Sequence, residues 1–340
     1  MSRIRLLVVL ALAACPESKP APPQPKPRVM DLDAGTEPKP PSLARPTPGA
    51  GELKKLDDGA LQLRGHSEPI LAVAFDPSGK RAATAGMDRS IRVWDLEEGK
   101  QLWAAGPGDE AVTAVAFDAS GEIIAAGDRG FQVRLWKVKD GELLRRRPHP
   151  DQVSSLSFSP DGKWLAVAGA SGETAVYPTG DDGPSKCDLR ARSVAFSDGG
   201  KYLVSATATG LITATEFPSC KKKKETSTAP HLPFGAASSK ATLYATRNGA
   251  EAQVLLWDAV GGRMLGKLDK QGAGVTSVSF SGDGKRALVT SEDGKARLYD
   301  VEKREVLKTI EVGPVPFGAL SQDGGKAIVA SGIEAKVVAL

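Results

Sequence analysis

The stretch that decides the fold is residues 65–95, with the sequence GHSEPILAVAFDPSGKRAATAGMDRSIRVWD. Its turn sequence, Asp76-Pro77-Ser78-Gly79-Lys80, separates the apolar run 70–75 from the small-residue run 82–86. A tight-turn sequence between two such runs is typical of a β-hairpin. An alternating run, 91–95, follows and closes the stretch with Trp94-Asp95.

The hairpin turn recurs along the chain, each time between two apolar runs that we expect to pair as antiparallel strands. The further copies are Asp118-Ala119-Ser120-Gly121, Ser159-Pro160-Asp161-Gly162, Ser197-Asp198-Gly199-Gly200, Ser281-Gly282-Asp283-Gly284 and Ser321-Gln322-Asp323-Gly324.

The closing aromatic also recurs, at intervals of 40 to 42 residues. Internal repeats of this length indicate solenoids or propellers. Seven units account for the chain from about residue 60 to its end. The closing positions are Trp94, Trp136, Tyr177, Phe217, Trp257 and Tyr299, with Leu340 in the seventh.

Each unit has room for four short strands. The second is crowded with small residues, as in 203–207, which suits a sheet buried between neighbouring sheets. The third alternates, as in 132–136, and is therefore expected to be half exposed. The fourth, such as 101–103, is short and polar, as expected of an outer edge. The pattern predicts an all-β fold, a seven-bladed β-propeller.

The ends of the repeat region predict how the ring closes. The chain stops at the third strand of the seventh unit, 337–340, whereas a strand-like run, 60–64, precedes the first repeat. Pairing the two would complete the last blade and remove its free edge. We therefore expect deletion of residues 59–64 to destabilise the domain strongly.

The repeats resemble the tryptophan–aspartate (WD) repeat family over about 280 residues. Gly65-His66 and Trp94-Asp95 match its signature pairs, and Trp257-Asp258 repeats one of them. The resemblance implies a structural tetrad of His66, Thr84, Asp88 and Trp94. The match weakens elsewhere: the third repeat keeps His149 and Tyr177 with Val167 and Ser171 between them, and the fifth has Ala237 in place of Phe.

The N-terminus predicts export. Basic residues, an apolar run too short to cross a bilayer and then small residues form a secretory signal peptide. Its end, Leu12-Ala13-Ala14-Cys15, resembles the lipobox of bacterial lipoproteins and implies lipidation of Cys15. The alternative is an ordinary signal with a chance cysteine. Pro16 follows where an aspartate would imply inner-membrane retention, so the outer membrane is favoured, on either its periplasmic side or the cell surface.

The chain is thus predicted to have three parts. Residues 1–14 are the signal peptide, residues 15–51 a disordered, lipidated tether, and residues 52–340 the propeller. The tether contains eleven prolines between Pro16 and Pro48 and cannot bury enough apolar surface to fold. It is interpreted as a spacer, with a proline-rich ligand for a partner as the alternative.

Net charge argues against nucleic acid as a partner. The formal charge is +4, and loss of Arg3 and Arg5 with the signal peptide would leave +2. Nucleic-acid binding calls for a strongly basic face. We expect a monomeric propeller that binds protein partners of unknown identity and the membrane through its lipid, with no cofactor.

Few residues suggest site chemistry. His66 and His149 occupy equivalent positions, which favours hydrogen bonding over metal binding, and His231 lies in an irregular stretch. Cys187 and Cys220 could form a disulfide in an exported protein or remain apart. The basic runs 145–147 and 221–224 are either solvated edge strands or sites for an acidic partner.

Catalytic motifs are absent from the sequence, so the chain is predicted not to be an enzyme. The favoured hypothesis is a membrane-anchored, protein-binding scaffold of the bacterial cell envelope. The second is an accessory of envelope assembly or transport, like the propellers of the barrel-assembly machinery or the Tol system. The third is an enzyme with carboxylates gathered in the central channel.

Overall fold

The computed structural model describes residues 51–106, 108–180, 183, 186–187, 189–228, 236–237, 242–248, 252–269 and 271–340, except the side chains of residues 236, 237 and 248. The predicted signal peptide, the lipobox Leu12-Ala13-Ala14-Cys15 and nearly all of the predicted tether lie outside these residues, as does His231. These predictions therefore stay predictions.

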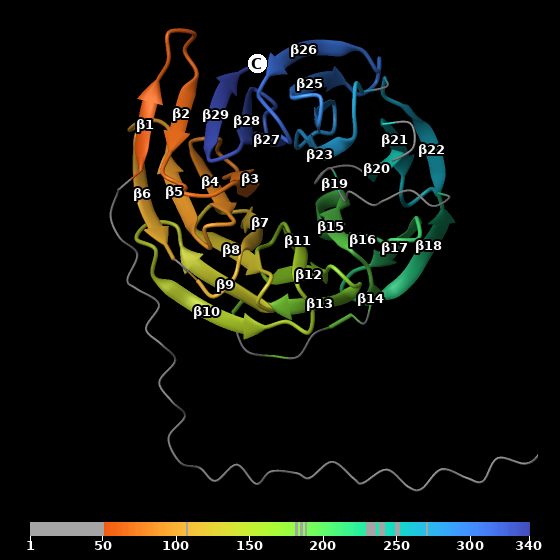
Figure 1. The fold of residues 1–340 in the computed structure, drawn as a ribbon. Helices are drawn as coiled ribbons and strands as arrows, with labels where there is room; N and C mark the ends of the chain where they lie inside the picture. Colours follow the sequence, from red (N-terminus) through yellow and green to blue (C-terminus); the bar gives the residue numbers. More distant parts are fainter. Residues whose placement is uncertain are drawn as a thin grey trace, which may run out of the picture. The chain divides into compact units, whose positions relative to one another are not determined.

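Seven antiparallel sheets surround a central axis, and the chain visits them in order (Figure 1). In each of blades 1 to 6 the four strands run in sequence from the axis to the rim. The predicted all-β, seven-bladed propeller is confirmed.

The strand bounds of the first six blades follow. Blade 1 has β3 (Ile70–Phe75), β4 (Arg81–Gly86), β5 (Ile91–Asp95) and β6 (Lys100–Ala105). Blade 2 has β7 (Val112–Phe117), β8 (Ile123–Asp128), β9 (Gln132–Lys137) and β10 (Leu143–Pro148). Blade 3 has β11 (Val153–Phe158), β12 (Trp164–Gly169), β13 (Glu173–Pro178) and β14 (Leu189–Arg190). Blade 4 has β15 (Ser193–Ser197), the 3-10 turn η1 (Asp198–Gly200), β16 (Tyr202–Ala206), β17 (Leu211–Glu216) and β18 (Lys221–Ser227). Blade 5 has β19 (Ala236–Ala237), β20 (Leu243–Asn248), β21 (Gln253–Asp258) and β22 (Arg263–Lys267). Blade 6 has β23 (Val275–Phe280), β24 (Arg286–Ser291), β25 (Lys295–Asp300) and β26 (Val306–Glu311).

Blade 7 joins the two ends of the fold. It contains β27 (Phe317–Leu320), β28 (Lys326–Ser331) and β29 (Glu334–Ala339), followed by β2 (Leu61–Arg64) and β1 (Glu52–Lys55). The predicted closure is confirmed, because β2 pairs antiparallel with β29. The strand β1 is a fifth strand that the sequence did not predict, because three of its four residues are charged and resemble a linker.

The ring is also closed by contacts at both of its faces. On one face the Ile70 amide donates to the Gly332 carbonyl oxygen at 2.7 Å. On the other, Lys326 Nζ donates to the Gly79 carbonyl oxygen at 2.9 Å. Blade 1 and blade 7 are thus bonded directly as well as through the shared strand.

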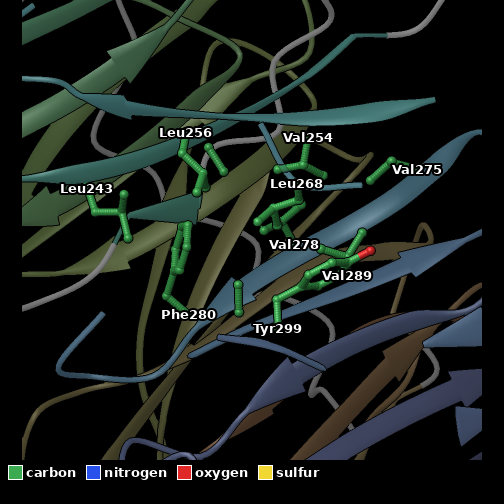
Figure 2. Close-up of a cluster of buried hydrophobic side chains, with 11 residues drawn as sticks. Leu243, Val254, Leu256, Leu268, Val275, Val278, Phe280, Val289 and Tyr299 are labelled. Carbon is green, nitrogen blue, oxygen red and sulfur yellow. The ribbon is translucent and has the colours of Figure 1, made fainter. Parts of the chain in front are cut away.

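The hydrophobic core lies between blades rather than within one. In Figure 2, Leu243 and Leu256 of blade 5 pack with Phe280, Val289 and Tyr299 of blade 6. The second strands allow this close approach because they carry small residues; in β4 every residue after the first is buried. The prediction of a small-residue strand buried on both faces is confirmed.

Two predictions about strand exposure are wrong. The third strand is not half exposed in blade 2, where Arg134 of β9 is buried. The outer strand β6 is not uniformly polar at its surface, because Trp103 is 2% exposed. Its ring packs against Trp136 of the next blade, and its Nε1 donates to the Val138 carbonyl oxygen at 2.8 Å. Both errors arise because the neighbouring blade covers residues that one repeat alone would leave exposed.

Two closing positions of the repeat also need correction. Register places Thr215, opposite Leu203, where Phe217 was predicted, and Val338, opposite Ala327, where Leu340 was predicted. In these two repeats the closing position comes two residues earlier than an even period predicts, so counting the period passes the end of each strand by one residue.

Candidate functional site

Strand order divides the loops between two faces. In a four-stranded antiparallel blade, the turn between the second and third strands lies at the same end as the connection to the next blade. We call this end the tetrad face. The opposite face carries the repeated hairpin turns between first and second strands, such as the turn at Asp76.

In blade 1 the four predicted tetrad residues come together. Trp94 Nε1 donates to Thr84 Oγ1 at 3.1 Å, and Thr84 Oγ1 lies 2.8 Å from His66 Nε2. His66 Nδ1 lies 2.8 Å from Asp88 Oδ2. Since a carboxylate only accepts, Nδ1 carries the proton, and the bonds form one directed chain from Trp94 to Asp88. This chain fixes the β4–β5 turn on the tetrad face.

The Asp88 carboxyl is held ionised by this network. Burial raises its pKa, but the hydrogen bonds from His66 and Ser90 outweigh burial and bring the pKa down to about 2. A carboxyl with a lowered pKa stabilises the fold above its unfolded value and loses that contribution as pH falls toward about 2. The sequence did not indicate Ser90, whose Oγ donates to Asp88 Oδ1 at 2.8 Å.

Other blades hold the equivalent turn with different residues. In blade 2, Arg134 Nη1 donates to Asp128 Oδ2 at 2.7 Å, and both side chains are almost fully buried. In blade 6, Gln271 Nε2 donates to the Tyr299 hydroxyl at 2.8 Å, and Gln271 Oε1 accepts from Arg297. The family signature predicted neither network, because the residue types differ while the positions correspond.

Blade 3 keeps the predicted His149 and Tyr177, with His149 Nδ1 and the Tyr177 hydroxyl 3.3 Å apart. Desolvation lowers the pKa of His149, although the Glu173 carbonyl opposes this. Asp151, rather than a residue of the turn itself, accepts from the Ser171 and Gly172 amides at 2.6 and 3.1 Å. The β12–β13 turn is therefore stabilised by a residue of the connection that precedes β11.

One position of this turn carries a large side chain in blades 1 and 2 and glycine or alanine in blades 3 to 6. Blades 3, 4 and 6 place a glycine there with positive φ: Gly172 (φ 110°), Gly210 (φ 82°) and Gly294 (φ 83°). Blades 1 and 2 place Arg89 (φ 62°) and Phe131 (φ 61°) in that conformation, and blade 5 places the small residue Ala252 (φ 51°) there. The left-handed region costs a residue with a side chain about 1–2 kcal/mol. Aligning the seven turns in the sequence would have revealed these two substitutions.

The side chains at these two turns face solvent. Phe131 is 47% exposed and Arg89 is exposed, and among the described residues the Arg89 side chain has no ion pair or hydrogen bond. Packing therefore does not account for either residue. Strained conformations that the fold itself does not require are concentrated at functional sites.

The connection from blade 1 to blade 2 links the two turns. The Gly108 amide donates to the Arg89 carbonyl oxygen at 2.8 Å, and the Glu110 side chain lies against Gly130, beside Phe131. Arg129, two residues before Phe131 in the sequence, lines a depression of about 400 Å³. The other lining residues are Thr113, Gln152, Val153, Ser154 and Ala170. We call Arg89, Arg129, Phe131 and this depression the blade 1–2 sector.

Blade 6 presents the opposite charge on the same face. A second depression, of about 530 Å³, is lined by Glu292, Asp293, Gly294, Glu311, Val312, Gly313 and Pro314. The tetrad face therefore presents arginine and an exposed aromatic ring at blades 1 and 2 and an acidic depression at blade 6.

Hydroxyl groups of the inner strands hold neighbouring blades together around the axis. Thr113 Oγ1 donates to the Val153 carbonyl oxygen at 2.5 Å, and Ser154 Oγ donates to the Arg192 carbonyl oxygen at 2.6 Å. Such bonds make the walls of the sector depression part of the rigid scaffold rather than of a loop.

The two cysteines lie in adjacent blades and are joined. Cys187 and Cys220 form a disulfide with their Cα atoms 5.5 Å apart. The outer strand of blade 3, β14, has two residues, and the disulfide links the segment just before it to the β17–β18 turn of blade 4. Sequence alone left this pairing open because it does not give the separation of the Cα atoms.

The two basic runs differ. Lys221–Lys224 are exposed on β18, where Lys222 pairs with Glu225 and Lys223 with Glu216. In the other run Arg147 is buried, donates to the Pro178 carbonyl oxygen at 3.1 Å and stacks over Tyr177. A solvated edge is thus the wrong interpretation of Arg147, because the carbonyl oxygen of the last residue of β13 accepts a hydrogen bond from its guanidinium.

Comparison with known families identifies the repeats. The family model described as "WD domain, G-beta repeat" matches residues 60–95, 102–137 and 141–177. That described as "Anaphase-promoting complex subunit 4 WD40 domain" matches residues 236–320. The chain contains WD repeats. The expected resemblance is confirmed to this extent, and the directed chain from Trp94 to Asp88 belongs to the first WD repeat.

Individual relatives share only part of their length with these WD repeats. Ribosome biogenesis protein erb1 of Botryotinia fuckeliana is 46% identical over 72 residues, 21% of this chain and 9% of the relative. Ribosome biogenesis protein ERB1 of Chaetomium thermophilum is 41% identical over 87 residues, 25% of this chain and 11% of the relative. Protein groucho of Drosophila melanogaster is 26% identical over 200 residues, 54% of this chain and 21% of the relative. The chain therefore spans about a tenth to a fifth of these relatives.

Within the described residues, no group of three or more His, Cys, Asp or Glu side chains is placed to hold a metal ion. The same part of the chain has no helix with the length and apolar character needed to span a bilayer.

Proposed function

We propose that this chain is a non-catalytic, membrane-anchored platform of the bacterial cell envelope that binds a protein partner on its tetrad face. One observation carries the proposal: two turns of that face hold solvent-facing Arg89 and Phe131 in a conformation that blades 3, 4 and 6 assign to glycine. A rigid face that keeps unfavourable, exposed side chains is suited to recognition rather than to stability.

Two further features support the envelope. The lipobox Leu12-Ala13-Ala14-Cys15 provides an anchoring cysteine, and a lipid contributes about 0.8 kcal/mol of membrane affinity per buried CH₂. The Cys187–Cys220 disulfide suits an oxidising compartment, since disulfides are rare where thiols are kept reduced. The proline-rich segment after Cys15 would hold the propeller away from the bilayer.

Site-specific photocrosslinking in living cells tests the binding face. A benzophenone amino acid at Gln152, in the sector depression, is expected to give one saturable crosslinked product. The same probe at Lys163, exposed in a hairpin turn of the opposite face, is the matched control and is expected to give none. Equal labelling from both positions, or none from Gln152, would contradict a partner on the tetrad face.

Anchoring is tested by Cys15→Ser. We expect this variant to move from the membrane fraction to the soluble fraction and to lose incorporation of radiolabelled fatty acid, because no other lipidation motif is present. The Cys187→Ser/Cys220→Ser double variant removes cysteines without touching the lipobox and should stay in the membrane fraction. Continued membrane attachment of Cys15→Ser would refute the anchor.

A further inference from the structure

The blade 1–2 sector has the chemistry of a carboxylate site beside an apolar contact. Arg129 lines a depression to which Thr113, Gln152 and Ser154 also contribute polar groups. Among the described residues its side chain has no ion pair or hydrogen bond, as for Arg89 in the neighbouring turn. Guanidinium groups bind carboxylates through paired hydrogen bonds.

The apolar part of the sector is the exposed ring of Phe131, two residues from Arg129. Met87, in the turn that carries Arg89, is 37% exposed and adds a second apolar side chain. Aromatic residues and arginine are the residue types that contribute most at interface centres.

The charges near the sector favour a short acidic segment over a polyanion. Arg192, exposed where the chain enters blade 4, adds a third cation on the tetrad face. Glu68 and Glu110 are also exposed beside these turns, and blade 6 carries the acidic depression. A nucleic acid carries one negative charge per nucleotide, and these carboxylates would repel it. A peptide, in contrast, can place a single carboxylate at Arg129.

We infer that the blade 1–2 sector recognises an acidic peptide segment in which a bulky apolar side chain adjoins aspartate or glutamate. Arg129 and Arg89 bind the carboxylates, and Phe131 packs against the apolar side chain. The inference rests on the proposed function, since it names the chemistry of the partner that the tetrad face binds.

The left-handed turns provide variants that separate binding from folding. Phe131→Gly and Arg89→Gly install the residue that blades 3, 4 and 6 already use at this position. Because glycine relieves the backbone, both variants should unfold at the same temperature as the parent chain or higher. Loss of binding in them cannot then be attributed to misfolding.

The test uses the full chain and fluorescein-labelled peptides followed by fluorescence anisotropy. The acidic probe is Gly-Ser-Asp-Glu-Phe-Asp-Glu-Ser-Gly; one control replaces its acids by the corresponding amides, and another replaces Phe by Ala. We expect the acidic probe to bind at least about 10-fold more tightly than either control. Phe131→Gly should weaken it about 5-fold or more, and Arg129→Gln should reduce the preference for acid over amide, with the remainder due to Arg89.

Lys163→Gln, on the opposite face, is the matched charge control and should bind like the parent chain. Equal affinity for the acidic and amide probes would overturn the inference, as would parental affinity in Phe131→Gly. Binding of a single-stranded oligonucleotide that is lost in Arg129→Gln would also overturn it, in favour of a polyanion. If the peptide preference fails while the Gln152 crosslink persists, the acidic-segment inference falls and the platform function stands.

Discussion

Asp128→Ala is expected to lower the free energy of unfolding by about 3–5 kcal/mol, because it leaves the buried Arg134 guanidinium without its partner. The two side chains are 2.7 Å apart, with 1% of Asp128 and 5% of Arg134 exposed. Asp128 also accepts from the Gln132 amide at 3.0 Å, so the turn that presents Phe131 loses a second contact. Urea unfolding followed by tryptophan fluorescence measures the change.

Asp109 provides the matched control for this prediction. Its carboxylate lies 3.9 Å from Arg134 but is 74% exposed, so Asp109→Ala should change stability by less than about 1 kcal/mol. The double variant Asp128→Ala/Arg134→Met removes both charges and should recover most of the loss. An Asp128→Ala chain as stable as the parent would mean that Arg134 does not depend on this pair.

Deleting Leu61–Arg64 is expected to destabilise the propeller by about 4 kcal/mol or more, an exceptional loss for so short a segment. The deletion removes β2, exposes the edge of β29 and vacates the space of Leu63, which is 1% exposed in the core between blades 7 and 1. It also breaks the Arg64–Glu334 ion pair. The thermal midpoint and the soluble yield measure the effect.

Deletion of Glu52–Lys55 is the control of equal length. It removes β1, whose residues are mostly exposed and which pairs only with β2. We expect a loss of no more than about 1 kcal/mol, since the ring stays closed. Equal effects of the two deletions would show that closure does not depend on β2.

The fold could be predicted because the same pattern of strands and turns recurs along the sequence. Six turn sequences and a nearly constant period give the number of blades, and the missing fourth strand of the last blade identifies its substitute before His66. The blade 1 hydrogen-bond chain could be predicted because all four of its residue types match one family signature.

Features that depend on two blades could not be predicted. In the sequence Arg134 occupies an alternating strand and resembles an exposed residue, and only the adjoining blade 1–2 connection and Asp128 explain its burial. Arg147 is buried by a loop of blade 3, and the disulfide crosses from blade 3 to blade 4. Repeat counting describes one blade at a time and gives no distance between neighbours.

The order of β1 and β2 has a mechanical consequence. Residue 51 enters the fold at β1, the outermost strand of blade 7, which is hydrogen-bonded to nothing but β2. A pulling force applied at residue 51 must break the hydrogen bonds between β1 and β2 before it acts on β2, the strand that closes the ring. The outer strand β1 can therefore detach from β2 and pair with it again while the ring of seven blades stays closed.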